Sequence, residues 1–407
     1  MKVITKLWLL VLIGAGHVPA YSDDSLRPGV PDHWITEQPA DVAWPTREWE
    51  RSRLTDYEMQ AWLDGMVESI FAPDHADSDR TPRALVVIQG GKIIAERYDT
   101  DNDCDATAWT GSIAKMNAAI MAGLLAREGK LRLDDPAPIP EWYKRAKDPR
   151  QAIKYRHILD FTDGLEWDNP YAEMTFVSMF QSNFMEMAFG EGALDSAQYT
   201  VERPLSHPPG SFYRYNDGLP SVMGYLFNDH MGFDAAQAAA YYQREVLDVT
   251  GMANSELEFD AAGNWYGASG MRWSACDMAR FGLLIMRDGV WDGKRILPEG
   301  WVREMTIPSA ASLSAARTLS GTALTYVSHV GYGLNTRVFG YKGSEGEFVP
   351  EVFGHGGYGG SVLLVRPDKD LILVMFGNDP GSGNTVTNDR FWKAHEIVDT
   401  LPAPAAM

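Results

Sequence analysis

The stretch that decides the fold is WTGSIAKMNAAI, residues 109–120. Ser112 and Lys115 are three positions apart, so they face the same side of the helix that the apolar pattern predicts over 114–130. The start of a helix favours negative charge on a serine oxygen, and an apolar helix weakens the hold of a lysine on its proton. The pair therefore predicts a nucleophile and its base, and a capping serine beside a solvated lysine is the alternative.

A tyrosine follows about a hundred residues later, in HPPGSFYRYNDG, residues 207–218. The Pro-Pro-Gly turn and a short extended segment deliver Tyr215 to a loop, followed by Asn216 and Asp217. A tyrosine near an amine can act as a phenolate or as a proton shuttle, with its pKa lowered by the lysine charge. The alternative is that Tyr213 and Tyr215 are alternate residues of a strand that pack as aromatics.

The third stretch is glycine-rich: FGHGGYGGSVLLV, residues 353–365. Glycines at the start of a strand let the backbone approach a ligand closely, and their N–H groups can line an oxyanion pocket. A glycine-rich bulge at a sheet edge is the alternative.

Periodicity around these stretches places β elements near both ends of the chain. Residues 83–99 and 360–378 each read as a β-hairpin, the first around Gly90-Gly91. Helices are predicted over 54–71, 274–289 and about 385–400. We expect an α+β fold, an antiparallel sheet built from both ends, flanked by helices and joined to a mainly helical domain. The sheet domain takes 51–105 and 250–400, and the helical domain, which carries the nucleophile, takes 106–249.

The three stretches, in this order, resemble the serine β-lactamase and penicillin-binding family. The likeness is greatest to the class C-related branch with its esterases, D-aminopeptidases and 6-aminohexanoate-dimer hydrolases. It extends from about residue 80 to 380, through RHILDFTDGLEWDN at 156–169 and SACDMARFGLLIM at 274–286. It implies the same α+β architecture.

The resemblance also implies roles for residues of this chain. Ser112 attacks a carbonyl and becomes the acyl-enzyme, Lys115 holds or accepts its proton, and Tyr215 relays a proton to the leaving group. The backbone N–H groups of Ser112 and Tyr358 form the oxyanion hole. Substrate-binding positions are Asn216, Asp217, His355, Gly356 and Gly357. The aromatic, Met-rich stretch at 165–185 adds Trp167 and Tyr171 as an apolar acyl pocket, or else as plain packing.

Two departures from the family pattern bear on the substrate. Asp217 stands where the lactamases have Asn, and His355-Gly356-Gly357 stands where they have Lys-Thr-Gly. A cation and a hydroxyl that grip a carboxylate are therefore missing, unless His355 is charged or an arginine such as Arg214 substitutes. These changes favour uncharged esters, or amides recognised elsewhere.

The leading hypothesis is thus a serine hydrolase that cleaves carboxylic esters or small amides through an acyl-enzyme on Ser112. A β-lactamase or D-Ala peptidase on the same fold is the alternative, and a catalytically silent ligand-binding protein is a second. An α/β-hydrolase is excluded because no serine has glycines at both −2 and +2.

Composition limits location and partners. The first twenty residues have a basic start, an apolar run and a small residue at Ala20, which predicts a signal peptide and a periplasmic or secreted protein, with no membrane insertion after cleavage. An irregular lead-in follows at 21–50. A net charge of −19 disfavours nucleic-acid partners and leaves a small-molecule ester or amide. We expect no metal and no cofactor, since histidines are scattered. Cys104 and Cys276 are either a disulfide or two buried thiols.

Overall fold

The computed structural model describes residues 34–72, 81–168, 182–319, 330–342, 348–378 and 389–404. The predicted signal peptide lies outside these ranges. The described part of the lead-in, 34–50, is mainly turns and loops, and it buries Trp34 and Trp49 in the core.

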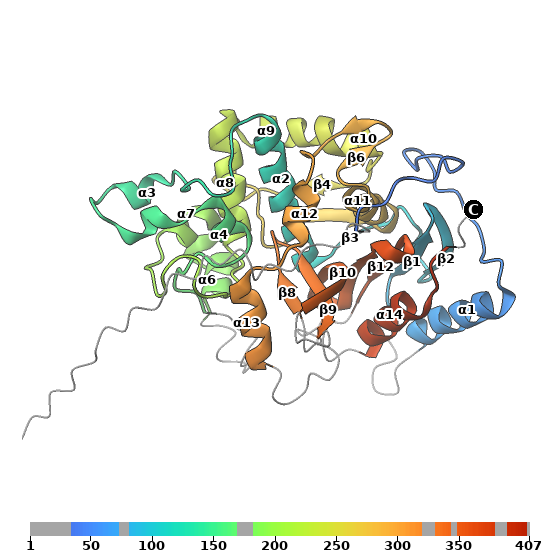
Figure 1. Cartoon of the computed structure of the whole chain (residues 1–407). Helices are drawn as coiled ribbons and strands as arrows, with labels where there is room; N and C mark the ends of the chain where they lie inside the picture. Colours follow the sequence, from blue (N-terminus) through green and yellow to red (C-terminus); the bar gives the residue numbers. More distant parts are fainter. Residues whose placement is uncertain are drawn as a thin grey trace, which may run out of the picture.

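A seven-stranded sheet forms the centre of the fold (Figure 1). Every neighbouring pair in it is antiparallel, and strand β1 from the N-terminal part pairs with β12 from the C-terminal part. The predicted α+β class, with an antiparallel sheet built from both ends of the chain, is confirmed. In spatial order the strands are β2 (Lys92–Tyr98), β1 (Ala84–Gln89), β12 (Leu371–Phe376), β11 (Ser361–Arg366), β10 (Phe348–Gly357), β9 (Arg337–Lys342) and β8 (Val330–Tyr332).

Both predicted hairpins are present, and the first shows why the sequence turns there. Gly90 and Gly91 have φ of 58° and 74°, the left-handed values that a two-residue hairpin turn requires. The second hairpin joins β11 to β12 through a short 3-10 turn at Pro367–Lys369.

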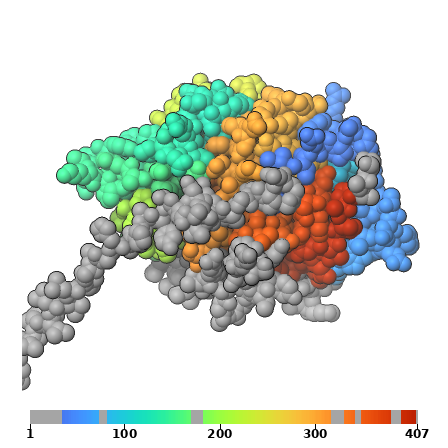
Figure 2. All heavy atoms as spheres, in the orientation of Figure 1, coloured from blue at the N-terminus to red at the C-terminus, as the bar shows by residue number. Residues whose placement is uncertain are grey.

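Helices cover both faces of the sheet. Leu85 and Val87 of β1 pack with α1 (Tyr57–Phe71) and α14 (Asp389–Thr400), whereas Val86 and Ile88 belong to the core on the other face, where α11 (Ala275–Met286) lies. This alternation follows from the two-residue period of a strand. Figure 2 shows the blue N-terminal and red C-terminal segments side by side on one part of the surface.

The helical part of the molecule is arranged around α2 (Met116–Arg127), which packs against α8 (Leu219–Met231). One continuous apolar core joins these helices to the sheet, and the domain boundaries stay a prediction. The other helices are α3 (Pro140–Tyr143), α4 (Tyr155–Leu159), α6 (Asn183–Phe189), α7 (Ser196–Val201), α9 (Ala235–Tyr242), α10 (Asp248–Thr250), α12 (Trp301–Thr306) and α13 (Ala310–Leu319). Two small sheets add β3 (Thr107–Trp109), β5 (Met271–Ser274) and β4 (Glu256–Leu257), and β6 (Val290–Trp291) with β7 (Lys294–Arg295).

The helices predicted over 54–71, 114–130 and 274–289 differ from the observed ones by up to three residues at their starts or ends. The α-helix predicted from 114 begins at Met116, and a single 3-10 turn, Gly111–Lys115, precedes it. Such turns are frequent at helix ends. None of the helices in the described ranges combines the length and the apolar character needed to cross a bilayer.

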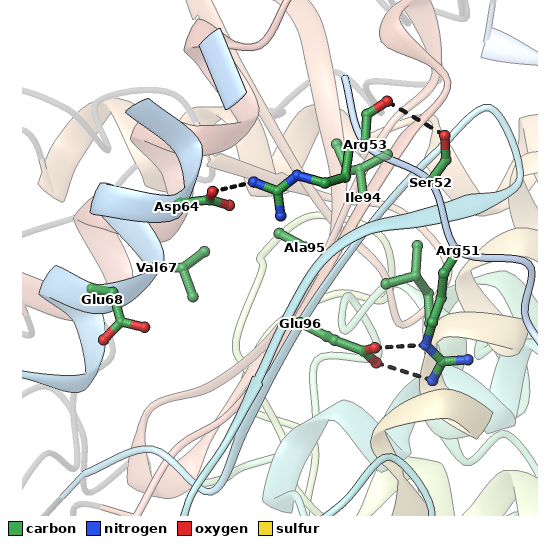
Figure 3. A pocket seen from close by; sticks show the side chains of 10 residues that line it. Arg51, Ser52, Arg53, Asp64, Val67, Glu68, Ile94, Ala95 and Glu96 are labelled. Carbon is green, nitrogen blue, oxygen red and sulfur yellow. Dashed lines mark hydrogen bonds and ion pairs between the residues drawn. The ribbon is translucent and has the colours of Figure 1, made fainter. Parts of the chain in front are cut away.

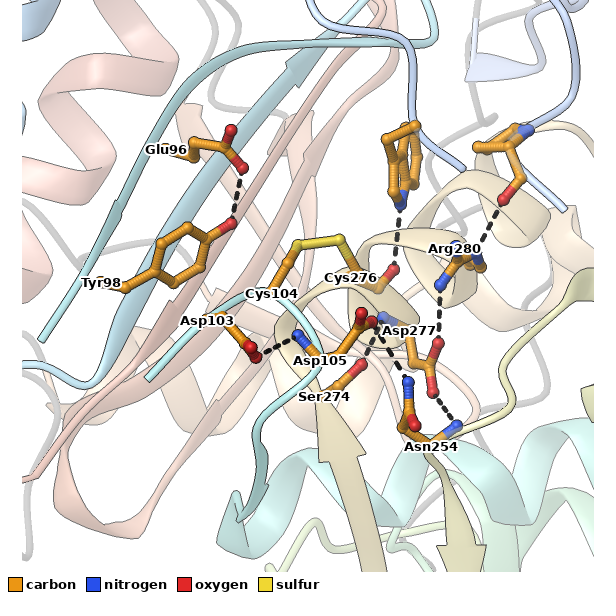
Figure 4. The surroundings of a disulfide bond; sticks show 12 residues. Glu96, Tyr98, Asp103, Cys104, Asp105, Asn254, Ser274, Cys276, Asp277 and Arg280 are labelled. Carbon is orange, nitrogen blue, oxygen red and sulfur yellow. Dashed lines mark hydrogen bonds and ion pairs between the residues drawn. A yellow bond between two sulfur atoms is a disulfide. The ribbon is translucent and has the colours of Figure 1, made fainter. Parts of the chain in front are cut away.

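Cys104 and Cys276 form a disulfide, the first of the two alternatives that the sequence left open (Figure 4). The bond joins the segment that leads into β3 to the first turn of α11, across 172 residues of chain. Both cysteines are buried, and the Cys276 amide also donates to the Cys104 carbonyl oxygen at 3.0 Å. The bond therefore ties the strand before Ser112 to the helix under the sheet.

We expect a Cys104→Ser/Cys276→Ser double variant to lose about 2–5 kcal/mol of unfolding free energy, because the bond restricts a long loop in the unfolded chain. Chemical denaturation of protein made in an oxidising compartment measures the loss, and reductant should not change the double variant further. Two free thiols in the unreduced, denatured wild type would contradict this expectation.

Candidate active site

Ser112 lies in the 3-10 turn between β3 and α2, in direct contact with Lys115. The Lys115 Nζ donates a hydrogen bond to the Ser112 Oγ at 3.0 Å. Lys115 has no exposed surface, so the alternative of a solvated lysine is wrong. The turn thus joins a half-buried hydroxyl to a fully buried amine.

Two further groups surround the same Nζ atom. The Ala268 carbonyl oxygen accepts a hydrogen bond from it at 2.7 Å, and Asp217 Oδ1 lies 2.8 Å away in an ion pair. The Asp217 side chain is almost fully buried. The amine is therefore held by segments that are far apart in the sequence.

Tyr215 completes this group from the loop before α8. The Lys115 Nζ lies 5.0 Å from the centre of its ring, and the Ser112 side chain is among the groups that act on its hydroxyl. Burial raises the pKa of Tyr215, and the Asp217 charge raises it further, against smaller opposing effects of Arg337 and Ser112. The sequence predicted a pKa lowered by the lysine, which is wrong in direction because burial dominates. Tyr215 is thus a neutral phenol that can donate or relay a proton.

Asn216, predicted to bind substrate with Asp217, is also buried. Its Oδ1 accepts a hydrogen bond from the Gly218 amide at 2.9 Å, at the start of α8. The contacts observed for these two side chains are thus with α8 and with Lys115, and their contact with substrate stays a prediction.

The glycine-rich strand end approaches the Ser112 turn closely. A Cβ on Gly357 would lie 1.8 Å from the Thr110 carbonyl oxygen, and a Cβ on Gly111 would lie 2.8 Å from the Tyr358 amide nitrogen. Only glycine fits at both positions. The Tyr358 amide thereby lies beside Gly111, the residue that precedes Ser112. An oxyanion hole made by the backbone amides of Ser112 and Tyr358 requires this proximity.

His355 is fully buried in β10, and both of its ring nitrogens have partners within the protein. Nδ1 lies 2.7 Å from the Gly356 carbonyl oxygen, so it carries the hydrogen, and Nε2 accepts from the Tyr332 hydroxyl at 3.1 Å. Burial, and then the charges of Arg337 and Lys115, hold the pKa of His355 well below its usual value. The imidazole is therefore neutral at physiological pH.

The cation at this position is Arg337, which the sequence analysis missed. It lies on β9 opposite Gly354 of β10, and its Nε donates to the Tyr332 hydroxyl at 2.5 Å. In the part of the chain that the structure describes, no carboxylate forms an ion pair with it. The register of β9 on β10 reveals this residue, and β9 was not predicted from the sequence.

Arg214, which the sequence offered as a substitute cation, contacts other groups. Its Nη1 donates to the Trp167 carbonyl oxygen at 2.9 Å, and its guanidinium lies over the Phe212 ring. The observed contacts of Arg214 are therefore with Trp167 and Phe212 rather than with His355.

The predicted acyl pocket is only partly described. Trp167 is buried in a small apolar cluster with Met187 and Ala268, which fits the packing alternative. The Ala268 carbonyl oxygen also accepts a hydrogen bond from Lys115, so this packing helps to position the lysine. Tyr171 lies outside the described residues.

A family model described as Beta-lactamase matches residues 67–396, most of the chain. The protein belongs to the beta-lactamase family. The 6-aminohexanoate-dimer hydrolase of Paenarthrobacter ureafaciens is 22% identical over 336 residues, which cover 81% of this chain and 81% of that protein. This is a family of hydrolases.

Solved structures share the fold of this beta-lactamase-family chain at low identity. EstCE1, a hydrolase with promiscuous acyltransferase activity, has a TM-score of 0.62 at 17% identity, covering 84% of this chain and 99% of its own. A D-stereospecific amidohydrolase from Streptomyces sp. has a TM-score of 0.56 at 18% identity, covering 82% and 97%.

A pocket remote from these residues lies between α1 and the edge strand β2 (Figure 3). Its charged side chains pair with each other, Arg51 with Glu96 and Arg53 with Asp64. None of the candidate site residues lines it. Within the described ranges, no group of three or more His, Cys, Asp or Glu side chains is placed to hold a metal ion.

Asp163 is a buried acid in the segment that resembles the Thr-Ser-Gly-Leu stretch of this beta-lactamase family. Its Oδ1 accepts from the Leu165 amide at 2.8 Å, and burial raises the pKa of Asp163 to about 7. The folded state therefore keeps a proton that the unfolded chain releases near the ordinary pKa of an aspartate, 3.8. Stability falls as pH rises through that window.

We expect Asp163→Asn to be more stable than the wild type at pH 8, because a neutral amide avoids the cost of a buried charge. The difference in unfolding free energy should grow from about pH 4 to 7 and then level off. Denaturation at several pH values measures it, with the exposed Asp101→Asn as control. A difference that does not change with pH would show that burial does not govern Asp163.

Proposed function

We propose that this protein is a serine hydrolase that cleaves carboxylic esters or small amides through an acyl-enzyme on Ser112. The observation that carries the proposal is the contact of 3.0 Å between the Ser112 Oγ and a lysine with no exposed surface. A serine hydroxyl is a weak nucleophile until a base within hydrogen-bond reach takes its proton.

In the acylation step the Ser112 Oγ attacks the substrate carbonyl carbon while its proton moves to the Lys115 Nζ. The developing oxyanion is stabilised by the backbone amides of Ser112 and Tyr358. The carbon–leaving-group bond then breaks, and Tyr215 gives its proton to the departing oxygen or nitrogen and regains one from Lys115.

In deacylation a water molecule attacks the ester of Ser112, and the same groups act in reverse. Tyr215 accepts a proton from the water as it passes its own to Lys115, and Lys115 returns a proton to the Ser112 Oγ. The position of Tyr215 supports this relay, because its ring lies 5.0 Å from the Lys115 Nζ and Ser112 is among the groups that act on its hydroxyl.

The substrate class rests on chemistry and on the relatives. The neutral His355 offers no charge to a substrate carboxylate, which favours neutral esters and amides. Relatives include a 6-aminohexanoate-dimer hydrolase and, at the level of fold, a D-stereospecific amidohydrolase and a hydrolase with acyltransferase activity.

We also propose that residues 1–20 are a signal peptide and that the enzyme works in the periplasm or outside the cell. The buried Cys104–Cys276 disulfide supports this location, because such bonds persist in oxidising compartments.

We expect Ser112→Ala to abolish labelling by a fluorophosphonate and to reduce hydrolysis of p-nitrophenyl esters by at least about a thousandfold. Lys115→Ala should cost nearly as much, because nucleophile and base act as a unit. Intact mass after labelling, together with ester kinetics, measures both effects. Lys144→Ala, at an exposed lysine, is the matched control.

Two outcomes would overturn this assignment. Near-normal ester turnover in Lys115→Ala would remove its role as base. A wild type that forms no adduct and turns over no ester would indicate the silent ligand-binding protein instead.

One observation favours the β-lactamase or D-Ala peptidase alternative. The Arg337 guanidinium lies beside Tyr332 and His355, next to the strand where the lactamases carry lysine, and no described carboxylate neutralises it. A guanidinium in this position can bind a substrate carboxylate.

Under this alternative we expect Arg337→Met to lower kcat/KM for nitrocefin and for a peptide ending in D-Ala-D-Ala by about tenfold or more. The kcat/KM of the same variant for neutral p-nitrophenyl acetate should change much less. Equal losses on charged and neutral substrates would exclude carboxylate binding by Arg337. Negligible nitrocefin and peptide turnover in the wild type would leave the ester and small-amide assignment.

A further inference from the structure

We propose that Asp217 is a positioning residue that acts through Lys115, as the counter-ion that sets the pH range in which this lysine becomes the base. The proposal rests on the proposed function of Lys115 as the acceptor of the Ser112 proton. Asp217 was expected to contact substrate in place of the lactamase Asn, and its observed contact is with the lysine instead.

The geometry makes the two charges direct partners. The Lys115 Nζ and Asp217 Oδ1 are 2.8 Å apart, and neither side chain is more than marginally exposed. Among the described residues, neither Asp217 oxygen has an aligned hydrogen-bond donor, so its contact with Lys115 is an ion pair. Attraction between opposite charges is screened little when water is absent.

Within the described part of the chain, the ionisable side chains that interact with this pair or its neighbours are neutral, apart from one guanidinium. Burial raises the pKa of each neighbouring tyrosine, and the pKa of the neighbouring histidine is lowered. The exception is a guanidinium, which keeps its proton throughout the working range. These neighbours are Tyr215 before α8, Tyr266 before β5, Tyr332 on β8, Arg337 on β9 and His355 on β10. Among these neighbours, Lys115 and Asp217 form the close pair of opposite charges.

The consequence follows from electrostatics. Lys115 can accept the Ser112 proton only after it has lost its own, and a carboxylate at 2.8 Å opposes that loss. An amide at position 217, as in the lactamases, would not oppose it. The Asp217 charge therefore disfavours the active, free-base form of Lys115, and removal of that charge should favour it.

The test compares wild type with Asp217→Asn, which removes the charge at nearly constant volume. The pH profile of kcat/KM for p-nitrophenyl acetate should keep its acid limb, displaced to lower pH by about one unit or more. The expectation concerns the position of this limb on the pH axis, whatever the maximal value of kcat/KM. Asp217→Ser removes the same charge with a smaller side chain, and it serves if the Asn variant does not fold. Asp217→Glu retains the charge and should keep the limb near its wild-type position.

A second readout does not need turnover. The ¹³Cε resonance of Lys115, assigned by comparison with Lys115→Arg, reports its protonation, and its midpoint should move down in Asp217→Asn by the same amount. The matched control is Asp277→Asn, at an equally buried aspartate that pairs with Arg280 outside the site at 2.7 Å. It should leave both the limb and the lysine midpoint in place.

The outcomes separate the two proposals. A lysine midpoint that stays in place, or moves up, overturns the role of Asp217 whether or not the enzyme is active. A uniform loss of rate with an unmoved limb also overturns it, because a purely structural role predicts that result. A displaced midpoint in a protein that hydrolyses no ester supports the counter-ion and overturns the proposed function alone.

Discussion

Burial of the Lys115 amine is the constraint on which the centre of this molecule depends. A lone ammonium in a water-free interior is unstable, so its surroundings must supply acceptors and an opposite charge. The Ala268 carbonyl and the Asp217 carboxylate supply them from two separate loops. Those loops are held by α8 and β5, so the helical layer and the small sheet must both be folded before the site exists.

A second constraint is the close contact between strand β10 and the turn that carries Ser112. The absence of side chains at Gly111 and Gly357 lets the two backbones approach, and the buried His355 closes the strand behind them through Tyr332 and Gly356. The result is a compact polar centre in an apolar shell, where most ionisable groups are neutral. The charges of the site lie on a few residues, so a substitution that removes one of these charges should alter the pH dependence of activity.

Local patterns predicted the elements that depend on their own residues. Asp56 and Ser274 cap α1 and α11 through the amides of Met59 and Asp277, and Gly90-Gly91 turns the first hairpin. Strands β8 and β9 were not predicted, because short strands near a chain end are stabilised by pairing with β10 rather than by their own pattern. Arg337 was missed for the same reason.

The sequence by itself determined the fold class and the order of Ser112, Lys115 and Tyr215, because helix periodicity, turn glycines and motif spacing are local properties. Only the tertiary structure decided the electrostatics. Asp217 pairs with Lys115, His355 is a neutral buried residue, and the Arg337 guanidinium lies beside Tyr332. Burial and the distance between charges fix these properties, and both arise only when segments far apart in the chain are packed together.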